Sequence, residues 1–212
     1  MLCARVLTSI ATLTVAIAVP QPTPWPEVFH AYMLKHRNGE VGHTDLFYDW
    51  PAGGNLHIDR IPGQPPFFDN ERQNGSTYYY TPGGSCKVIE MGVGLLPPNW
   101  LDGAEYIGNQ TVRSASDKSV NCHVWTKGDA MGNATGPFIT YYENIETKTP
   151  ARWRFFDGMY FDILRWEPGK QASPEQWQLP PSCLNKSASS SSIPGEDAHK
   201  AMREARLAHL II

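Results

Sequence analysis

The sequence predicts a mainly β protein, a curved antiparallel meander that forms a half-barrel or a barrel. Three observations lead to this fold class. Short segments of alternating apolar and polar residues recur along the chain, as in half-buried strands. The 18 Gly and 18 Pro residues separate these segments, and both residue types favour turns. Finally, 7 Trp, 9 Tyr and 8 Phe are available for the core, and twisted sheets of about ten strands tend to curl or close.

Within a single domain predicted at residues 19–183, the strands follow one another in order. Val28–Arg37 leads through Asn38-Gly39, a pair typical of a tight hairpin turn, to Asp45–Trp50. In that second strand, side chains at alternate positions share one face. Further strands are predicted at Asn55–Ile61, Ser76–Thr81, Cys86–Val93, Glu105–Val112, Val120–Lys127, Pro137–Ile145, Ala151–Phe156 and Tyr160–Glu167. Short turns predict antiparallel neighbours, since parallel pairing needs long crossovers.

One or two short helices are expected between the strands. The irregular stretch 62–74 is one candidate, and Pro97–Leu101 is the other; we expect a short helical turn there because a helix start tolerates proline. Residues 184–194 form a serine-rich linker. Residues 195–212 predict a C-terminal helix or tail with an apolar stripe. Docking on the domain, contact with a membrane surface, a sorting signal and a frayed tail remain alternatives for it.

The first residues, 1–18, predict a secretory signal peptide. Arg5 precedes an apolar stretch from Val6 to Val19, and Ala16 and Ala18 are placed as in an Ala-x-Ala cleavage site. The ~14 apolar residues fall short of the ~20 that span a membrane, although a single N-terminal anchor remains the alternative. We expect a protein of the secretory pathway, extracellular or vacuolar, with no transmembrane segment in the mature chain.

Secretion changes the interpretation of the cysteines and asparagines. Cys3 is lost with the signal peptide, which leaves Cys86, Cys122 and Cys183 in an oxidising compartment. We pair Cys86 with Cys183 in a disulfide, because Cys122 lies in an apolar strand that can bury a free thiol; the other pairings stay open. N-glycosylation sequons, which require surface positions, occur at Asn74, Asn109, Asn133 and Asn185.

Charge and motifs narrow the function classes. The formal net charge is −3 and the 212-residue chain contains no run of Lys and Arg, so we expect no nucleic-acid partner. The sequence contains no G-x-S-x-G, no P-loop, no G-x-G-x-x-G and no H-E-x-x-H motif, and no catalytic residue is assigned. His57 and Asp59 share a strand face and stay a weak alternative as base and orienting acid or as a metal ligand and its neighbour.

No cofactor is expected, with calcium as the exception that the sequence leaves open. Glu143 and Glu146 lie at an acidic hairpin end where carboxylate oxygens suit a hard cation. An ordinary polar turn explains the same residues, and we favour that interpretation.

A curved sheet with many aromatic residues and no convergent catalytic set is suited to enclosing an apolar ligand. We therefore predict a binding protein whose concave sheet face holds a hydrophobic, lipid-like small molecule. The predicted pocket is lined by Leu46, Tyr48, Trp50, Tyr142, Trp153 and Phe155. An aromatic core without a cavity is the alternative for the same composition.

Five segments also carry a resemblance: Pro24–His30, Asp45–Pro51, Pro98–Ala104, Cys122–Lys127 and Tyr141–Pro150. Over residues 24–183 the chain resembles a family of uncharacterised secreted proteins of plants and green algae. Some members are labelled glycosyl-group transferases, although this chain contains no Asp-x-Asp pair. The later half is similar, more distantly, to ependymin-like and lipoprotein-carrier-like domains, which implies a half-barrel with a hydrophobic ligand and, in some members, calcium. A glycan-acting enzyme and an extracellular interaction module without a small ligand are the alternative functions.

Overall fold

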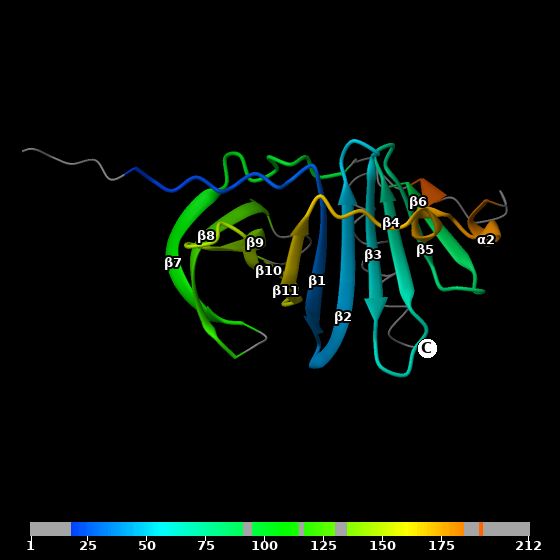
Figure 1. Ribbon diagram of the computed structural model, residues 1–212, viewed down its shortest axis with the longest axis horizontal. Coiled ribbons are helices and arrows are strands. Elements are labelled where there is room, and N and C mark those ends of the chain that lie inside the picture. Colours follow the sequence, from blue (N-terminus) through cyan, green and yellow to red (C-terminus); the bar gives the residue numbers. More distant parts are fainter. Residues whose placement is uncertain (1–17, 91–94, 115–116, 130–134, 185–190, 193–212) are drawn as a thin grey trace, which may run out of the picture.

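The fold is one large sheet in a computed structural model that describes residues 18–90, 95–114, 117–129, 135–184 and 191–192 (Figure 1). Its strands are β1 (Val28–Arg37), β2 (Glu40–Asp49), β3 (Gly54–Arg60), β4 (Phe67–Arg72), β5 (Ser76–Tyr80), β6 (Cys86–Glu90), β7 (Glu105–Arg113), β8 (Ser119–Asp129), β9 (Pro137–Asn144), β10 (Pro150–Phe155), β11 (Tyr160–Pro168) and β12 (Ser191–Ser192). Their order across the sheet is β12-β6-β5-β4-β3-β2-β1-β11-β10-β9-β8-β7.

The sheet consists of two antiparallel meanders that meet at β1. Strands β1 to β6 run outward in chain order, and β7 to β11 return from the opposite edge, so that β11 pairs with β1. The connection between β6 and β7 therefore crosses from one edge of the sheet to the other. In the described pairings the edge strands β7 and β12 do not meet, so the sheet stays open. This confirms the curved meander of the half-barrel type and not the closed barrel.

Local sequence explains most of the strands, with one exception. The turn after β1 is the predicted Asn38-Gly39 pair, and both residues have the positive φ that such a turn requires. Strand β4 lies in the stretch 62–74, where a helix was one expectation. Its residues do not alternate, because Phe67 and Asp69 are buried on one face and Asn70 on the other. Alternation therefore could not reveal it.

The short helices follow β11 near the end of the domain and do not lie in the stretches 62–74 or 97–101, where they were expected. They are α1 (Pro174–Trp177) and α2 (Pro181–Leu184). The helical turn expected at Pro97–Leu101 is instead a pair of successive tight turns, in which the Trp100 N–H donates to the Pro97 carbonyl and the Asp102 N–H to the Asn99 carbonyl. The predicted C-terminal helix, nearly all of the serine-rich linker and most of the signal peptide lie outside the described residues. No helix in the described part of the chain is long and apolar enough to span a membrane.

The two faces of the sheet carry different cores. The main core is on the concave face, since strands as distant in the sheet as β2 and β8 contribute Tyr48 and Trp125 to one cluster. The rings of Tyr48 on β2 and Trp153 on β10 both lie near the ring of Trp25, at 5.7 and 5.3 Å, although three strand spacings of about 4.8 Å separate their strands. This closeness places them on the inner side of the curve. On the opposite face Phe47 and Leu56 pack under Trp177, which belongs to the segment that crosses in front of the sheet in Figure 1.

The predicted disulfide is present. Cys86 of β6 is bonded to Cys183 of α2 across a sequence separation of 97 residues, so the end of the domain is tied to one side of the sheet. Cys122 is a buried free thiol, as expected. Burial raises the pKa of Cys122 to about 11, so this thiol stays protonated and unreactive at neutral pH.

Candidate functional site

The concave face holds an aromatic cluster that we call the concave cluster. Its centre is one cross-strand row in which directly opposite residues share a face: Tyr106, Trp125, Tyr141, Trp153 and Phe161, from β7 to β11. Opposite side chains in a sheet lie close enough to pack. The buried residues of the cluster are Phe29, Ala31, Met33, Leu46, Tyr48, Trp100, Leu101, Trp125, Ile139, Tyr141, Trp153, Met159 and Phe161.

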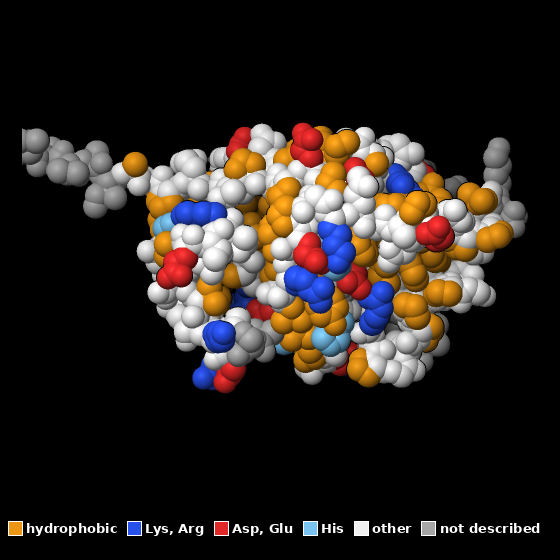
Figure 2. Space-filling view, viewed as in Figure 1, with side chains coloured by type: hydrophobic (Ala, Val, Ile, Leu, Met, Phe, Trp, Pro, Cys, Tyr) orange, Lys and Arg blue, Asp and Glu red, His pale blue; other side chains and the backbone are white. Residues whose placement is uncertain are grey.

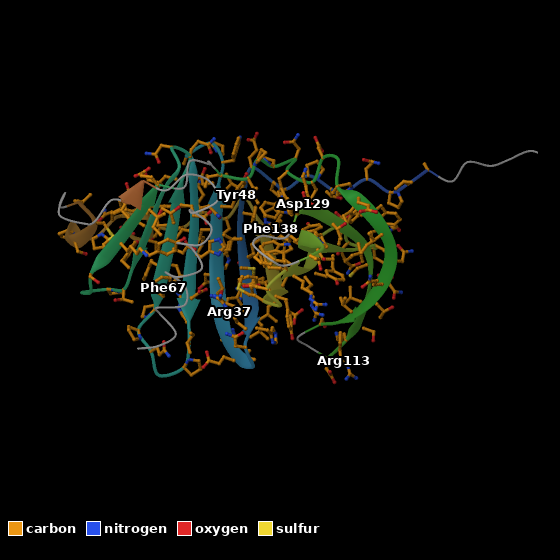
Figure 3. The ribbon with its side chains drawn as sticks, turned by 180° about the vertical axis from the view of Figure 1, so that it is seen from behind. Arg37, Tyr48, Phe67, Arg113, Asp129 and Phe138 are labelled. Atoms are coloured by element: carbon orange, nitrogen blue, oxygen red, sulfur yellow. A yellow bond between two sulfur atoms is a disulfide. The ribbon has the colours of Figure 1, made fainter. Side chains whose placement is uncertain are left out.

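Five of the six predicted pocket residues belong to this cluster. Leu46, Tyr48 and Trp153 are buried in it, and Trp50 and Phe155 pack against it partly exposed. Figure 3, which looks from behind, shows the labels of Tyr48 on β2 and Phe138 on β9 close together in the view, and both residues belong to or pack against the concave cluster.

Tyr142, the sixth predicted pocket residue, does not face the concave cluster. Its side chain packs with Val112, Cys122 and Val124 on the opposite face of the sheet, and its neighbour Tyr141 takes the expected position. In a strand, successive side chains point to opposite faces, so the choice depends on the register of the β8–β9 hairpin. That register pairs Trp125 with Tyr141. Pairing the two aromatic residues across the hairpin is the sequence signal that would have selected Tyr141 over Tyr142.

The residues before β1, 18–27, form a segment without strand structure that we call the N-terminal strap. Figure 1 shows it passing along one end of β7 to β11 before the chain enters β1. Its Trp25 is only partly buried, yet it lies among rings from five other segments. The centroid of its ring is 5.2 Å from Trp100, 5.3 Å from Phe29 and Trp153, 5.7 Å from Tyr48 and 6.5 Å from Trp166.

Residues 95–104, part of the connection from β6 to β7, form a second cover over the concave cluster. Trp100 and Leu101 are buried in the cluster. The Tyr48 hydroxyl donates to the Leu96 carbonyl at 2.8 Å, and the backbone N–H of Trp25 donates to the Pro98 carbonyl at 2.9 Å. The cluster is therefore closed by two segments outside the strands, and these two segments are bonded to each other.

The site also contains buried polar atoms. Glu143 is fully buried; its Oε2 accepts a hydrogen bond from the Thr23 N–H at 2.9 Å, and its Oε1 has no hydrogen-bond partner among the described residues. The indole nitrogens of Trp100, Trp125 and Trp153 likewise have none. Buried polar groups usually have partners in folded proteins, and these four atoms lie on or beside one aromatic cluster, where a ligand could bond to them.

The two buried phenols of the site stay protonated. Burial raises the pKa of Tyr141, and although the hydrogen bond from Trp25 opposes this effect, the nearby charge of Glu143 adds to it. Burial and the charge of Glu27 raise the pKa of Tyr48 in the same direction. Neither phenol therefore acts as an anion at neutral pH. The Trp25 indole N–H donates to the Tyr141 hydroxyl at 3.3 Å, which fixes the strap over this ring.

A polar rim borders the cluster on β7 and β8. The Tyr106 hydroxyl donates to Asn109 Oδ1 at 2.6 Å, and His123 Nδ1 lies 2.8 Å from the same oxygen. Asn109 is exposed, as its sequon requires, and Asn74 is exposed in the turn between β4 and β5. The other two sequons, at Asn133 and Asn185, lie outside the described residues.

The opposite face carries a charged cluster centred on His30. Figure 2 shows acidic, basic and histidine side chains gathered near the middle of this face. Both ring nitrogens of the buried His30 lie 2.7 Å from a carboxylate oxygen, one of Asp45 and one of Glu167. Arg60 pairs with Asp45, and Lys170 with Glu167. Each carboxylate thus has a basic partner within the protein, and the arrangement stabilises the fold without offering a free catalytic group.

The pKa values of this charged cluster follow from its contacts. Burial alone would raise the pKa of Asp45, but the hydrogen bond from His30 and the charge of Arg60 outweigh it and lower the pKa below the ordinary 3.8. For Glu167, hydrogen bonds from Lys170 and His30 lower the pKa to about 2.

The remaining polar candidates from the sequence do not assemble into a site. Asp59 is bonded by Lys35 and by the Thr44 hydroxyl, so its main partners are on β1 and β2. Glu143 is buried, whereas Glu146 is exposed in the turn after β9. In the described residues no group of three or more His, Cys, Asp and Glu side chains could hold a metal ion. Calcium remains a prediction that no contact supports.

Residues 24–183 match a protein family described as "Domain of unknown function (DUF8395)". No curated protein matches the chain. This match covers the stretch in which the sequence resembles a secreted family, and its description does not support the glycosyl-group transferase label.

Three solved structures match the chain at low sequence identity. An uncharacterized conserved protein from Thermus thermophilus has a TM-score of 0.50 and 12% identity, over 79% of this chain and 91% of that chain. MucB has a TM-score of 0.42 and 12% identity, over 76% and 60% of the two chains. A chain of the MucA/MucB complex of Pseudomonas aeruginosa has a TM-score of 0.40 and 11% identity, over 73% and 56%. At such identities the likeness to the Thermus protein concerns the fold alone.

Proposed function

The chain belongs to the DUF8395 family, and from its geometry we propose that it is a binding protein whose concave cluster takes a hydrophobic, lipid-like ligand beneath the N-terminal strap. The observation that carries this proposal is the position of Trp25. A side chain from a segment without strand structure fills the centre of a curved aromatic surface and contacts five rings there. It occupies the position that a flat or elongated apolar ligand would take.

Magnitudes support an exchange between the strap and a ligand. A partly buried Trp removes about 100 Å² from water, which is worth ~2.5 kcal/mol at ~25 cal/mol per Å². A lipid that buries about ten methylene groups gains ~8 kcal/mol on the same scale. The ligand therefore offsets the loss of the Trp25 contacts, and the strap closes again over the bound chain or moves aside.

The disulfide between Cys86 and Cys183 is compatible with a secreted or extracytoplasmic location, because such bonds persist in oxidising compartments. We propose the extracellular space or the vacuole as the place of binding. There a hydrophobic metabolite needs a carrier, since it is poorly soluble in water.

The test is a fluorescence titration with diphenylhexatriene, an uncharged apolar probe that emits when it leaves water. We expect the wild type to bind the probe. Trp25→Ala should bind it at least tenfold more tightly, because the variant no longer has to displace an indole whose contacts are worth ~2.5 kcal/mol and each ~1.4 kcal/mol is a factor of ten. Trp25→Phe, which keeps an apolar ring, should lie between the two proteins.

Leu164→Ala is the matched control. Leu164 is 39% exposed on β11, and its neighbour Ile163 is the residue that packs against the concave cluster. The control should bind the probe as the wild type does. If near-ultraviolet circular dichroism shows folded protein and neither the wild type nor the Trp25 variants bind the probe, the proposal is wrong.

A further inference from the structure

The four unpartnered polar atoms of the concave cluster lie around one residue, Tyr141. Tyr141 is directly opposite Trp125 on β8 and Trp153 on β10, and opposite residues have their Cβ atoms about 5 Å apart. The ring of Trp100 meets that of Tyr141 edge-on at 5.7 Å. Glu143 is two residues further along β9, on the same face and about 6.8 Å away by strand rise. Three indole donors and one carboxylate acceptor thus belong to residues that neighbour Tyr141.

Their chemistry is specific. An indole N–H only donates, and a carboxylate oxygen only accepts. Each such group that stays buried without a partner costs about 1–3 kcal/mol. A single group that satisfies both kinds must accept from an indole and donate to Glu143 Oε1. An ester or ether oxygen cannot donate, and a carboxylate ligand neither donates nor tolerates the charge of Glu143 at this range.

We infer that the ligand of the concave cluster is a hydrophobic alcohol, whose hydroxyl group lies beside Tyr141, donates to Glu143 and accepts from the surrounding indole N–H groups. The inference rests on the proposed function and narrows its ligand class from lipids in general to hydroxylated ones, such as long-chain alcohols and sterols. The phenol of Tyr141 does not fill this role, because its oxygen accepts from the Trp25 indole and it makes no hydrogen bond to Glu143 Oε1.

The experiment measures displacement of bound diphenylhexatriene by three ligands of matched chain length: 1-decanol, methyl decyl ether and decanoate, at pH 7.5. For the wild type we expect decanol to displace the probe at a concentration about tenfold or more below that of the other two. A hydrogen bond to a charged group is worth ~1.5–3 kcal/mol, which corresponds to roughly tenfold or more in affinity.

Glu143→Gln separates hydrogen bonding from size and apolarity. Glutamine keeps a carbonyl oxygen for the Thr23 N–H and places an amide donor where Oε1 was. The variant should therefore bind decanol at least tenfold less tightly and decanoate more tightly than the wild type does. Glu146→Gln, three residues along the chain and exposed, is the matched control and should leave all three affinities unchanged.

The outcomes distinguish this inference from the proposal on which it rests. If the three ligands displace the probe at equal concentrations from the wild type, the hydroxyl inference is wrong and the hydrophobic site stands. If Glu143→Gln and Glu146→Gln have the same affinities for the three ligands, Glu143 does not bond to the ligand hydroxyl and the inference is again wrong. If neither the wild type nor the Trp25 variants bind the probe, the proposed function itself fails.

Discussion

Asp45 is the residue through which acid acts on the charged cluster. Its carboxylate is paired with His30 and Arg60, and its pKa lies below the ordinary 3.8. A carboxylate with a depressed pKa in the folded state contributes stability that is fully present above its unfolded pKa. That contribution is lost as the pH falls through the lower, folded value. The acid sensitivity of the fold should therefore lie below about pH 4.

Asp45→Asn tests this account. At pH 7 we expect its free energy of unfolding to fall by about 1–3 kcal/mol, because a charged hydrogen bond to a buried partner is removed. Between pH 5 and pH 2.5 the wild type should lose more stability than the variant. Urea unfolding followed by circular dichroism measures both. Asp129→Asn, an exposed position, serves as the control, and an equal loss of stability with acid in wild type and Asp45→Asn would contradict the account.

Single residues also show which side-chain positions the sequence could predict and which it could not. The pattern of β2 predicts that Leu46, Tyr48 and Trp50 share a face, and all three lie in or against the concave cluster. The choice between Tyr141 and Tyr142 failed because one step along a strand reverses the face. Trp25 was not predicted as part of the site, since a residue before the first strand has no periodicity that could place it.

At the scale of elements, the disulfide is the strongest local constraint. It joins β6 to α2 over 97 residues, and closing a loop of about 100 residues contributes up to ~4.7 kcal/mol in the chain-entropy model. We expect Cys86→Ser with Cys183→Ser, or reduction of the wild type, to lower the free energy of unfolding by about 2–5 kcal/mol. Thermal unfolding with and without dithiothreitol gives the measurement.

Cys122→Ala is the control for that experiment. Its thiol is free and buried, so reductant should lower the melting temperature of this variant as much as that of the wild type. A melting temperature that does not respond to reductant in either protein would show that the disulfide does not stabilise the fold.

The elements differ in how well the local sequence predicts them. Strands whose faces differ in polarity follow from alternation, and β1 was predicted at its observed bounds. Strand β4 was missed because polar Asp69 and Asn70 are both buried, which removes the polar and apolar alternation. The positions of the strap and of residues 95–104 depend on tertiary contacts such as the one between Trp25 and Pro98. No local sequence pattern predicts these positions.

At the scale of the whole molecule, the path of the chain explains why a site exists on the concave face. The two meanders place β1 beside β11, so the chain must cross from β6 to β7, and part of that crossing covers the aromatic cluster. A simple meander in chain order, as the sequence suggested, would need no such crossing. The short turns within each meander were predicted correctly, but the long connection from β6 to β7 was not, because pairing between strands far apart in sequence leaves no local signal.

The central claim is that the concave cluster takes a hydrophobic ligand in exchange for the contacts of Trp25. Native mass spectrometry of the secreted chain, before and after incubation with 1-decanol, tests it most directly. We predict one lipid-like molecule per chain, either already bound or taken up on incubation, and higher occupancy in Trp25→Ala than in the wild type. A folded chain that carries no such molecule and takes up none, with or without Trp25, would contradict the claim.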